Sequence, residues 1–278
     1  MKASDKTDML SDAKNRRIPI RSWIPSRASC QIVLIHGLCE HIDCYGSVAE
    51  NLSNQGIAIH LMDLPGHGMA QGIRGHIDHY REYLDNITLL VEKNPNFLAG
   101  KPAFLMGHSL GGLIATQYCL RRENHFRGLI LTSPLIGFVK PGSVITSFVA
   151  EKLAKNHSNH PFPKPNSPKS LSRNPDHWQF YNSDPLRGRL ITPNLYLQMA
   201  AMIKSLNLAS SALSIPLLMF ISTKDRVVSP EASKLFFARV GSRDKSMVVF
   251  TQAMHELLQE QERKQVLDRV QSWIRDRC

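Results

Sequence analysis

The sequence predicts an α/β fold: a mostly parallel sheet with helices on both faces and an inserted helical lid. Two observations support this prediction. Short apolar runs alternate with helical segments through most of the 278 residues, and the alternation stops at residues 137–213 before it resumes. We therefore divide the chain into a first part of the core at 1–136, a lid at 137–213 and a second part of the core at 214–278.

The predicted strands are of two kinds. The run at 31–36 contains four consecutive apolar residues, most of them β-branched, as is typical of a strand buried on both faces of a parallel sheet. The run at 18–24 alternates in polarity and is bounded by Pro25, which predicts an edge strand. Further core strands are expected at 57–62, 103–106, 128–132, 217–221 and 247–250.

Helical segments separate these strands, at 45–55, 80–93, 110–121 and 231–240. The last helix is expected at 256–275 and is amphipathic, with an inward face made of Val266, Leu267, Val270, Trp273 and Ile274. Crossovers between parallel strands are right-handed, and ligands of such sheets bind beyond the carboxyl ends of the strands. Functional residues should therefore lie in the loops that follow the strands.

The lid is predicted from three segments. Residues 144–153 are apolar at helical spacing, whereas 157–176 contains five prolines and is expected to be an irregular loop. Thr192 and Pro193 form a typical helix start, a capping hydroxyl followed by proline. The helix that follows has one apolar face, made of Leu195, Met199, Met202, Ile203 and Leu206.

The net charge of +11 is concentrated in the lid, where nine Lys/Arg and three Asp/Glu give +6. One interpretation is a solvated basic surface. A second is peripheral contact with anionic membrane lipid, or binding of an anionic substrate. Nucleic-acid binding is not expected, because no basic stripe interleaved with aromatic residues is present.

Cysteine usage and apolar runs predict a cytoplasmic protein that is peripheral to membranes at most. No run of 18 apolar residues could form a membrane-spanning helix, and the polar segment 1–12 does not resemble a secretory signal. The five cysteines are irregularly spaced and form no Cys-x-x-Cys pair, so neither a disulfide framework nor a zinc site is expected. His157 and His160 lack further ligands nearby in sequence, and no metal site is predicted there.

The pentapeptide Gly107-His108-Ser109-Leu110-Gly111 follows an apolar strand and begins a helix. This is the context of the Gly-x-Ser-x-Gly nucleophile elbow, in which the serine occupies a sharp turn and the glycines let strand and helix approach closely. A plain glycine-rich turn is the alternative. The elbow predicts that Ser109 is a nucleophile and that the fold is the α/β-hydrolase fold.

A serine nucleophile needs a base to accept its proton, and in this fold the order along the chain is Ser, then Asp or Glu, then His. Asp225 and His255 each follow a predicted strand, in that order. Alternatively, the first is a turn carboxylate and the second a helix-capping imidazole. Together with Ser109 they predict a catalytic triad in which Asp225 orients the imidazole.

The oxyanion hole of such an enzyme uses two backbone N–H groups, one after the nucleophile and one in the loop after an early strand. We assign these donors to Leu110 and Leu38, since His36-Gly37 directly follows a predicted strand. A plain tight turn at His36-Gly37 is the alternative. Backbone donors leave little trace in sequence, so only Gly37 carries a signal.

Taken together, these residues resemble the monoacylglycerol lipase and lysophospholipase branch of the α/β-hydrolases, over about residues 14–276. The resemblance implies hydrolysis of a fatty-acyl ester, a lid over the acyl chain and no cofactor. The motifs that carry it are His36-Gly37, Glu40-His41, Tyr45, Asp63-x-Pro65-Gly66-His67-Gly68, Gly72-x-Arg74-Gly75, the elbow with Gly112, Ser133-Pro134, Asp184-Pro185-Leu186, Asp225 and His255-Glu256-Leu257.

The chain departs from the family pattern at three positions. Ser222 and Gln252 stand where the family often has glycine, three residues before the acid and three before the histidine. Cys39 stands where a small residue often follows the oxyanion position. Cys39 is either reactive beside the active site or buried and inert.

The lid suggests a substrate with an alkyl chain. Phe148, Val149, Leu195 and Met199 are predicted to line an acyl-binding tunnel, together with Val144, Ile145, Met202 and Ile203, although these faces could also simply pack on the core. The basic lid disfavours an aminopeptidase, which would need carboxylates for the substrate ammonium. The leading hypothesis is a hydrolase of monoacylglycerol or lysophospholipid. The alternatives are an acyltransferase or short-chain esterase with the same triad, and a non-catalytic binding protein on the same scaffold.

Overall fold

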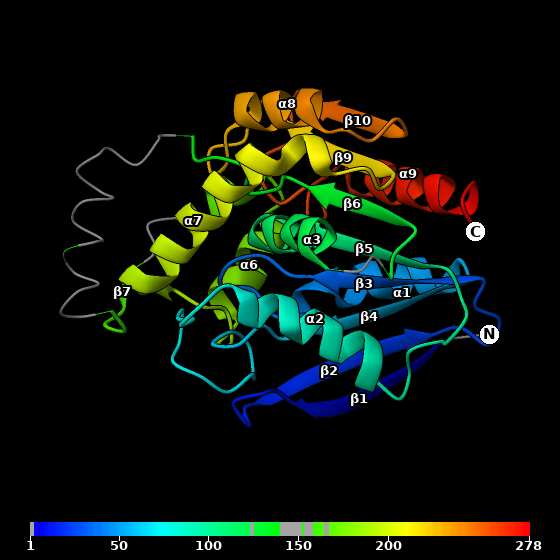
Figure 1. The fold of residues 1–278 in the computed structure, drawn as a ribbon, viewed down its shortest axis with the longest axis horizontal. Helices are drawn as coiled ribbons and strands as arrows, with labels where there is room; N and C mark the ends of the chain where they lie inside the picture. Colours follow the sequence, from blue (N-terminus) through cyan, green and yellow to red (C-terminus); the bar gives the residue numbers. More distant parts are fainter. Residues whose placement is uncertain (1–2, 123–124, 140–151, 153–157, 164–166) are drawn as a thin grey trace.

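The computed structural model describes residues 3–122, 125–139, 152, 158–163 and 167–278. Its centre is an eight-stranded sheet in the order β1-β2-β4-β3-β5-β6-β9-β10 (Figure 1). The strands are β1 Ser4–Ser11, β2 Arg17–Ile24, β3 Cys30–Ile35, β4 Ile57–Met62, β5 Ala103–His108, β6 Gly128–Thr132, β9 Leu217–Ser222 and β10 Lys245–Phe250.

The six strands from β4 to β10 in this order run parallel, while β2 is antiparallel to both of its neighbours. The mostly parallel sheet is therefore confirmed. The prediction that 18–24 forms an edge strand was wrong, because β1 pairs with β2 along its whole length and forms the edge instead. Every residue of β3, β4, β5, β6 and β9 is buried, as expected for strands covered on both faces.

Helices cover both faces of the sheet, as predicted. The first face carries α2 Arg81–Lys93, α3 Leu110–Arg121 and α8 Pro230–Arg239, whose buried side chains share one hydrophobic cluster. The second carries η1 Ile42–Tyr45, α1 Gly46–Asn54 and α9 Arg263–Arg275, which share another. The five inward residues predicted for the last helix are all buried, but α9 begins at Arg263 because residues 256–262 form turns.

The predicted lid segment, residues 137–213, lies between β6 and β9. Its described elements are β7 Phe162–Pro163, α5 Pro168–Leu171, α6 Pro175–Ser183, β8 Leu190–Ile191, α7 Pro193–Ala209 and η2 Ser210–Ala212. Apart from residue 152, the helix expected at 144–153 lies outside the described residues, and so does His157. The helix start at Thr192 is confirmed, since its hydroxyl accepts a hydrogen bond from Leu195 N at 3.2 Å.

The irregular loop predicted for 157–176 is replaced in part by two short helices. Pro168 and Pro175 occupy the first helical turn of α5 and α6, and the preceding Ser167 and Asn174 cap them by accepting hydrogen bonds from backbone N–H groups. Helix α7 packs on α3, where Gln117 Nε2 donates to the carbonyl of Met202 at 2.8 Å (Figure 1). Among the described residues, no helix combines the length and the apolarity needed to span a bilayer.

Candidate active site

Ser109 occupies a sharp turn between β5 and α3. Its φ of 51° and ψ of −117° lie outside the regions that L-residues ordinarily adopt, so the backbone is strained there. The turn depends on the two flanking glycines. A Cβ on Gly107 would lie 2.3 Å from the carbonyl oxygen of Gly111, and one on Gly111 would lie 2.1 Å from that of Ile35. The elbow geometry expected from the sequence is present.

The three residues of the predicted triad lie together at the carboxyl end of the sheet. His255 Nε2 is 2.9 Å from Ser109 Oγ, and His255 Nδ1 is 2.7 Å from Asp225 Oδ2. All three side chains are buried. Asp225 Oδ1 accepts hydrogen bonds from the backbone N–H groups of Val227 and Val228, so the oxygen that faces His255 is held in place.

The two departures from the family pattern beside the triad form contacts between its loops. Ser222 Oγ donates to the carbonyl of Ala253, and Lys224 N donates to Ser222 Oγ at 3.1 Å. Lys224 Nζ also donates to Gln252 Oε1 at 2.6 Å. The residues that replace the glycines therefore join the loop of Asp225 to the loop of His255.

The loop after β3 carries the predicted oxyanion donor at Leu38. The start of this loop is held by His36. Its Nε2 accepts a hydrogen bond from Leu64 N at 2.9 Å, while its Nδ1 donates to the carbonyl of Gly37. Burial lowers the pKa of His36 to about 4, which keeps the ring neutral. Leu110 is the first residue of α3, so its N–H is one of those that have no acceptor within the helix.

A cavity of about 230 Å³ opens onto Ser109 and His255. Met199 lines it, as predicted for the acyl tunnel. Leu195 does not; it is fully buried in the core. Phe148 and Val149 lie outside the described residues. Apolar and aromatic lining residues that the sequence did not indicate are Leu135, Phe138, Leu171, Ile191, Tyr196 and Val227.

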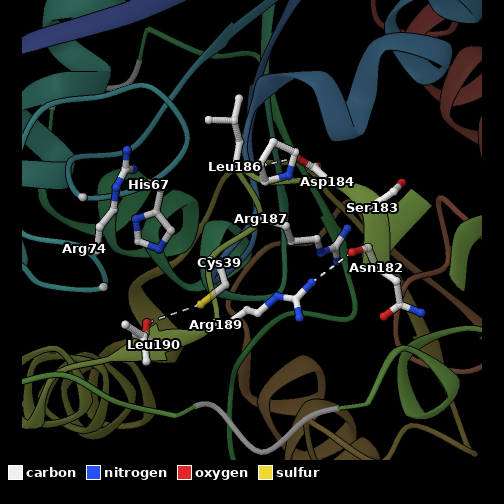
Figure 2. A pocket seen from close by; sticks show the side chains of 14 residues that line it. Cys39, His67, Arg74, Asn182, Ser183, Asp184, Leu186, Arg187, Arg189 and Leu190 are labelled. Atoms are coloured by element: carbon white, nitrogen blue, oxygen red, sulfur yellow. Dashed lines mark hydrogen bonds between the residues drawn. The ribbon is translucent and has the colours of Figure 1, made fainter. Parts of the chain in front are cut away.

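A second, larger cavity of about 430 Å³ is lined by residues 182–190 of the lid segment and by residues of the core that include His67 and Arg74 (Figure 2). Cys39 lines this cavity. Its φ of 64° is left-handed, which explains why glycine suits this position. The Cys39 side chain is buried, and its Sγ contacts the carbonyl oxygen of Leu190 at 3.6 Å.

A buried ionic cluster that the sequence did not indicate lies beside the active site. Arg187 of the lid segment reaches both Glu40, on the oxyanion loop, and Glu256, which follows His255. Despite burial, the pKa of both carboxyls is lowered, by His108 and the Arg187 guanidinium for Glu40 and chiefly by the Arg187 guanidinium for Glu256, so they remain ionised. Both glutamates belong to motifs that the sequence shows, but no periodicity or motif indicates that Arg187 would lie between them.

His41, Cys44 and Asp184 are the described residues whose side chains come close enough together to resemble a metal site. Their chemistry does not fit a cation. His41 Nε2 already lies 2.6 Å from Asp184 Oδ2, and burial raises the pKa of the Cys44 thiol, so a thiolate ligand is disfavoured. The Arg187 guanidinium also lies 3.8 Å from Cys44 Sγ and would repel a metal ion.

Comparison with known proteins places these features in context. The family profile described as serine aminopeptidase, S33, matches residues 26–262. A monoacylglycerol lipase of Mycolicibacterium smegmatis is 30% identical over 245 residues, which are 87% of each chain. A phospholipase of Bacillus subtilis is 30% identical over 253 residues, 88% of this chain and 95% of the relative. The crystal structure of Paleococcus ferrophilus monoacylglycerol lipase superimposes over 100% of both chains with a TM-score of 0.84 and 26% identity.

Proposed function

We propose that this chain, which belongs to the serine aminopeptidase S33 family and to its monoacylglycerol lipase and lysophospholipase branch, hydrolyses fatty-acyl esters at Ser109. The observation that carries the proposal is the continuous hydrogen-bonded series Ser109, His255, Asp225 beside a cavity with an apolar wall. Monoacylglycerol and lysophospholipid are the proposed substrates, since relatives carry the names monoacylglycerol lipase and phospholipase.

The first step would form an acyl-enzyme. Ser109 Oγ attacks the ester carbonyl carbon while its proton passes to His255 Nε2, and the carbonyl oxygen becomes an oxyanion that accepts hydrogen bonds from Leu38 N and Leu110 N. The tetrahedral intermediate then collapses. The carbon–oxygen bond to the alcohol breaks, and the imidazolium gives its proton to the departing alkoxide.

The second step would release the fatty acid. A water molecule replaces the alcohol, His255 accepts its proton, and the hydroxide adds to the acyl carbon. Collapse of this intermediate breaks the bond to Ser109 Oγ, which recovers the proton from His255. If a second alcohol took the place of water, the same groups would transfer the acyl chain to it, so acyl transfer stays an alternative outcome of this step.

The wall of the cavity suits the alkyl part of such a substrate. Phe138 and Tyr196 stack with ring centroids 5.8 Å apart, and Met199 lies three residues along α7 from Tyr196. Each CH₂ group removed from water contributes about 0.8 kcal/mol, so an acyl chain binds such a wall without polar recognition. The flexible thioether of Met199 would adapt to chains of different length.

The family description raises aminopeptidase activity as a second possibility. Glu40 and Glu256 line the cavity, and carboxylates are the groups that would bind a substrate ammonium there. Both carboxylates are instead paired with Arg187, so neither is available as an isolated negative charge. The cluster therefore favours an ester substrate without a free amine.

We also propose peripheral contact with anionic lipid through the basic lid segment, where Lys169 and Lys204 are exposed. Co-sedimentation with vesicles tests this contact. Binding should require phosphatidylserine, weaken with added salt and weaken in the variant Lys169→Gln/Lys204→Gln. Equal binding to pure phosphatidylcholine vesicles would contradict it.

The ester proposal is tested with 4-nitrophenyl esters from acetate to palmitate, monoacylglycerol, lysophosphatidylcholine and an aminoacyl 4-nitroanilide. We expect cleavage of the medium- and long-chain esters and no cleavage of the anilide. Ser109→Ala should abolish cleavage and labelling by a fluorophosphonate probe. A wild-type protein that is not labelled at neutral pH would indicate a binding protein, a preference for acetate would indicate a short-chain esterase, and acyl glycerol formed in excess glycerol would indicate acyl transfer.

A further inference from the structure

We propose that Arg187, in the lid segment, is a positioning residue. It would hold two loops in their reactive arrangement: the loop after β3 that carries Leu38 and Glu40 (the oxyanion loop) and the loop after β10 that carries His255 and Glu256 (the histidine loop). This role rests on the proposed function and adds to it a group that touches neither the substrate nor Ser109. It assigns a purpose to the lid segment besides covering the substrate. The inference comes from three sets of contacts, made by Arg187, Glu40 and Glu256.

Arg187 lies between the two cavities. It lines the larger one, where Figure 2 shows its side chain beside that of Arg189, whereas Glu40 and Glu256 line the cavity at Ser109. Arg187 is 4% exposed. Its guanidinium also lies 4.4 Å from the centre of the Tyr181 ring, so the lid segment itself fixes the direction of the side chain.

Glu40 links Arg187 to the oxyanion loop. Arg187 Nη2 donates to Glu40 Oε1 at 3.3 Å, and Glu40 Oε2 accepts from Gly37 N at 2.7 Å and from Tyr45 Oη at 2.6 Å. A Cβ on Gly37 would lie 2.7 Å from Glu40 Oε2, so this approach requires glycine. The carboxylate therefore fixes the turn that presents the N–H of Leu38.

Glu256 links Arg187 to the histidine loop. Its Oε1 accepts from the same Arg187 Nη2 atom, and its Oε2 lies 2.6 Å from His177 Nε2 of α6. The backbone N–H of Glu256 donates to the carbonyl of Leu171 at 2.8 Å, again in the lid segment. Since Glu256 directly follows His255, these contacts restrict where the imidazole can lie.

Arg187 supplies the positive charge that the two carboxylates share. Glu40 and Glu256 are both buried, and the charge of Glu256 raises the pKa that Glu40 would otherwise have. Without the guanidinium, two carboxylates would repel each other in a site with little water, and the loops that carry them would separate. Because one nitrogen contacts both carboxylates, the loss of Arg187 would disturb both loops at once.

The experiment compares kcat and KM for 4-nitrophenyl octanoate in the wild type, Arg187→Met, Arg187→Lys and Arg187→Met/Glu256→Gln. Arg189→Met is the matched control, since Arg189 lies two residues away, is exposed and donates to the carbonyl of Asn182 rather than to a catalytic loop. Thermal unfolding and the rate of fluorophosphonate labelling are measured for each protein.

We expect Arg187→Met to lower kcat and the labelling rate by about 10- to 100-fold, because small displacements of reacting groups have effects of that size, while KM changes by less than about threefold. Arg187→Lys should be intermediate, since an ammonium keeps the charge without the fork geometry. The double variant should recover to within about fivefold of the wild type, because it removes one unbalanced carboxylate. Arg189→Met should stay within about twofold.

Three results would overturn the role. They are a folded Arg187→Met with kcat near the wild-type value, an equal loss in Arg189→Met, or a double variant no more active than Arg187→Met. If Arg187→Met does not fold, Arg187→Lys decides: lowered kcat at unchanged KM supports the role, and wild-type kcat overturns it. A wild type without esterase activity would overturn the proposed function as well, whereas an active wild type with an indifferent variant would overturn only the positioning role.

Discussion

Ser222 Oγ donates a hydrogen bond to the carbonyl oxygen of Ala253, and this bond joins the loop that carries Asp225 to the loop that carries His255. Ser222→Ala would leave a buried carbonyl and the N–H of Lys224 without this partner. We expect the free energy of unfolding to fall by about 1–3 kcal/mol. We also expect kcat to fall several-fold while KM changes little. Urea denaturation and steady-state kinetics measure the two effects, and the exposed Ser183→Ala is the control.

Asp225→Asn tests the orientation of the imidazole. Asp225 Oδ1 accepts from two backbone N–H groups, so the amide oxygen of an asparagine would take that place and its NH₂ would face His255 Nδ1. The ring would then carry its proton on Nε2 and could not accept the proton of Ser109. We expect kcat to fall about 10⁴-fold with little change in stability. Asp244→Asn, at a distant surface ion pair, should keep full activity, and a loss below tenfold in Asp225→Asn would argue against the triad.

If the cavity beside Ser109 binds the acyl chain, as proposed, the size of its side chains should affect chain-length preference. Met199→Trp would fill part of a cavity of about 230 Å³, so the optimum in the ester series should move to shorter chains. The ratio of kcat/KM for octanoate to that for palmitate measures the change. Leu208→Trp, on the same helix but 80% exposed, should leave the ratio unaltered. An unchanged optimum in Met199→Trp would place the acyl chain elsewhere.

Acidification should destabilise the protein through its buried neutral histidines. Burial lowers the pKa of His60 to about 4. The usual pKa of a histidine is about 6.5, so below that pH the unfolded chain binds a proton at this residue, whereas the folded chain does not bind it until about pH 4. Each unit by which the pH falls in this range therefore lowers the free energy of unfolding by about 1.4 kcal/mol. Burial lowers the pKa of His36 and His67 in the same sense.

The variant His60→Gln isolates one of these contributions. Between pH 6.5 and 4.5 its free energy of unfolding should depend on pH less steeply than that of the wild type, by about 1.4 kcal/mol per unit. Urea denaturation at several pH values gives both slopes. Identical slopes would mean that His60 is protonated in the folded chain, against its burial and against the hydrogen bond that Asn94 Nδ2 donates to His60 Nδ1.

Much of the architecture could be predicted because burial leaves a pattern. The wholly buried strands β3, β4 and β6 are short apolar runs, and their predicted limits differ from the observed ones by one residue at most. Strand β1 could not be found in this way, because Leu10 is its one buried residue and its pairing with β2 is made by backbone groups. Any sequence with an extended backbone can make such bonds.

The sequence contains the start signals of helices α5 and α6, although the segment was predicted to be a loop. Ser167-Pro168 and Asn174-Pro175 are the same cap-and-proline start that correctly predicted α7 at Thr192. A dense run of prolines favours a loop, whereas two of these five prolines, Pro168 and Pro175, stand in the first turn of a helix. The residues of the proposed triad could be chosen from their place after strands. Arg187 could not, because its partners are distant in sequence and an isolated arginine resembles any surface residue.

The shared contact of Arg187 Nη2 with Glu40 and Glu256 also limits which substitutions this sequence can accumulate during evolution. Loss of Arg187 alone leaves two buried carboxylates without their cation, and such an intermediate would be selected against. Related chains that lack an arginine here should therefore have lost an acid at one of the two glutamate positions, or have acquired another cation close by. Correlated replacement at these sites is the trace that the cluster would leave in the history of the family.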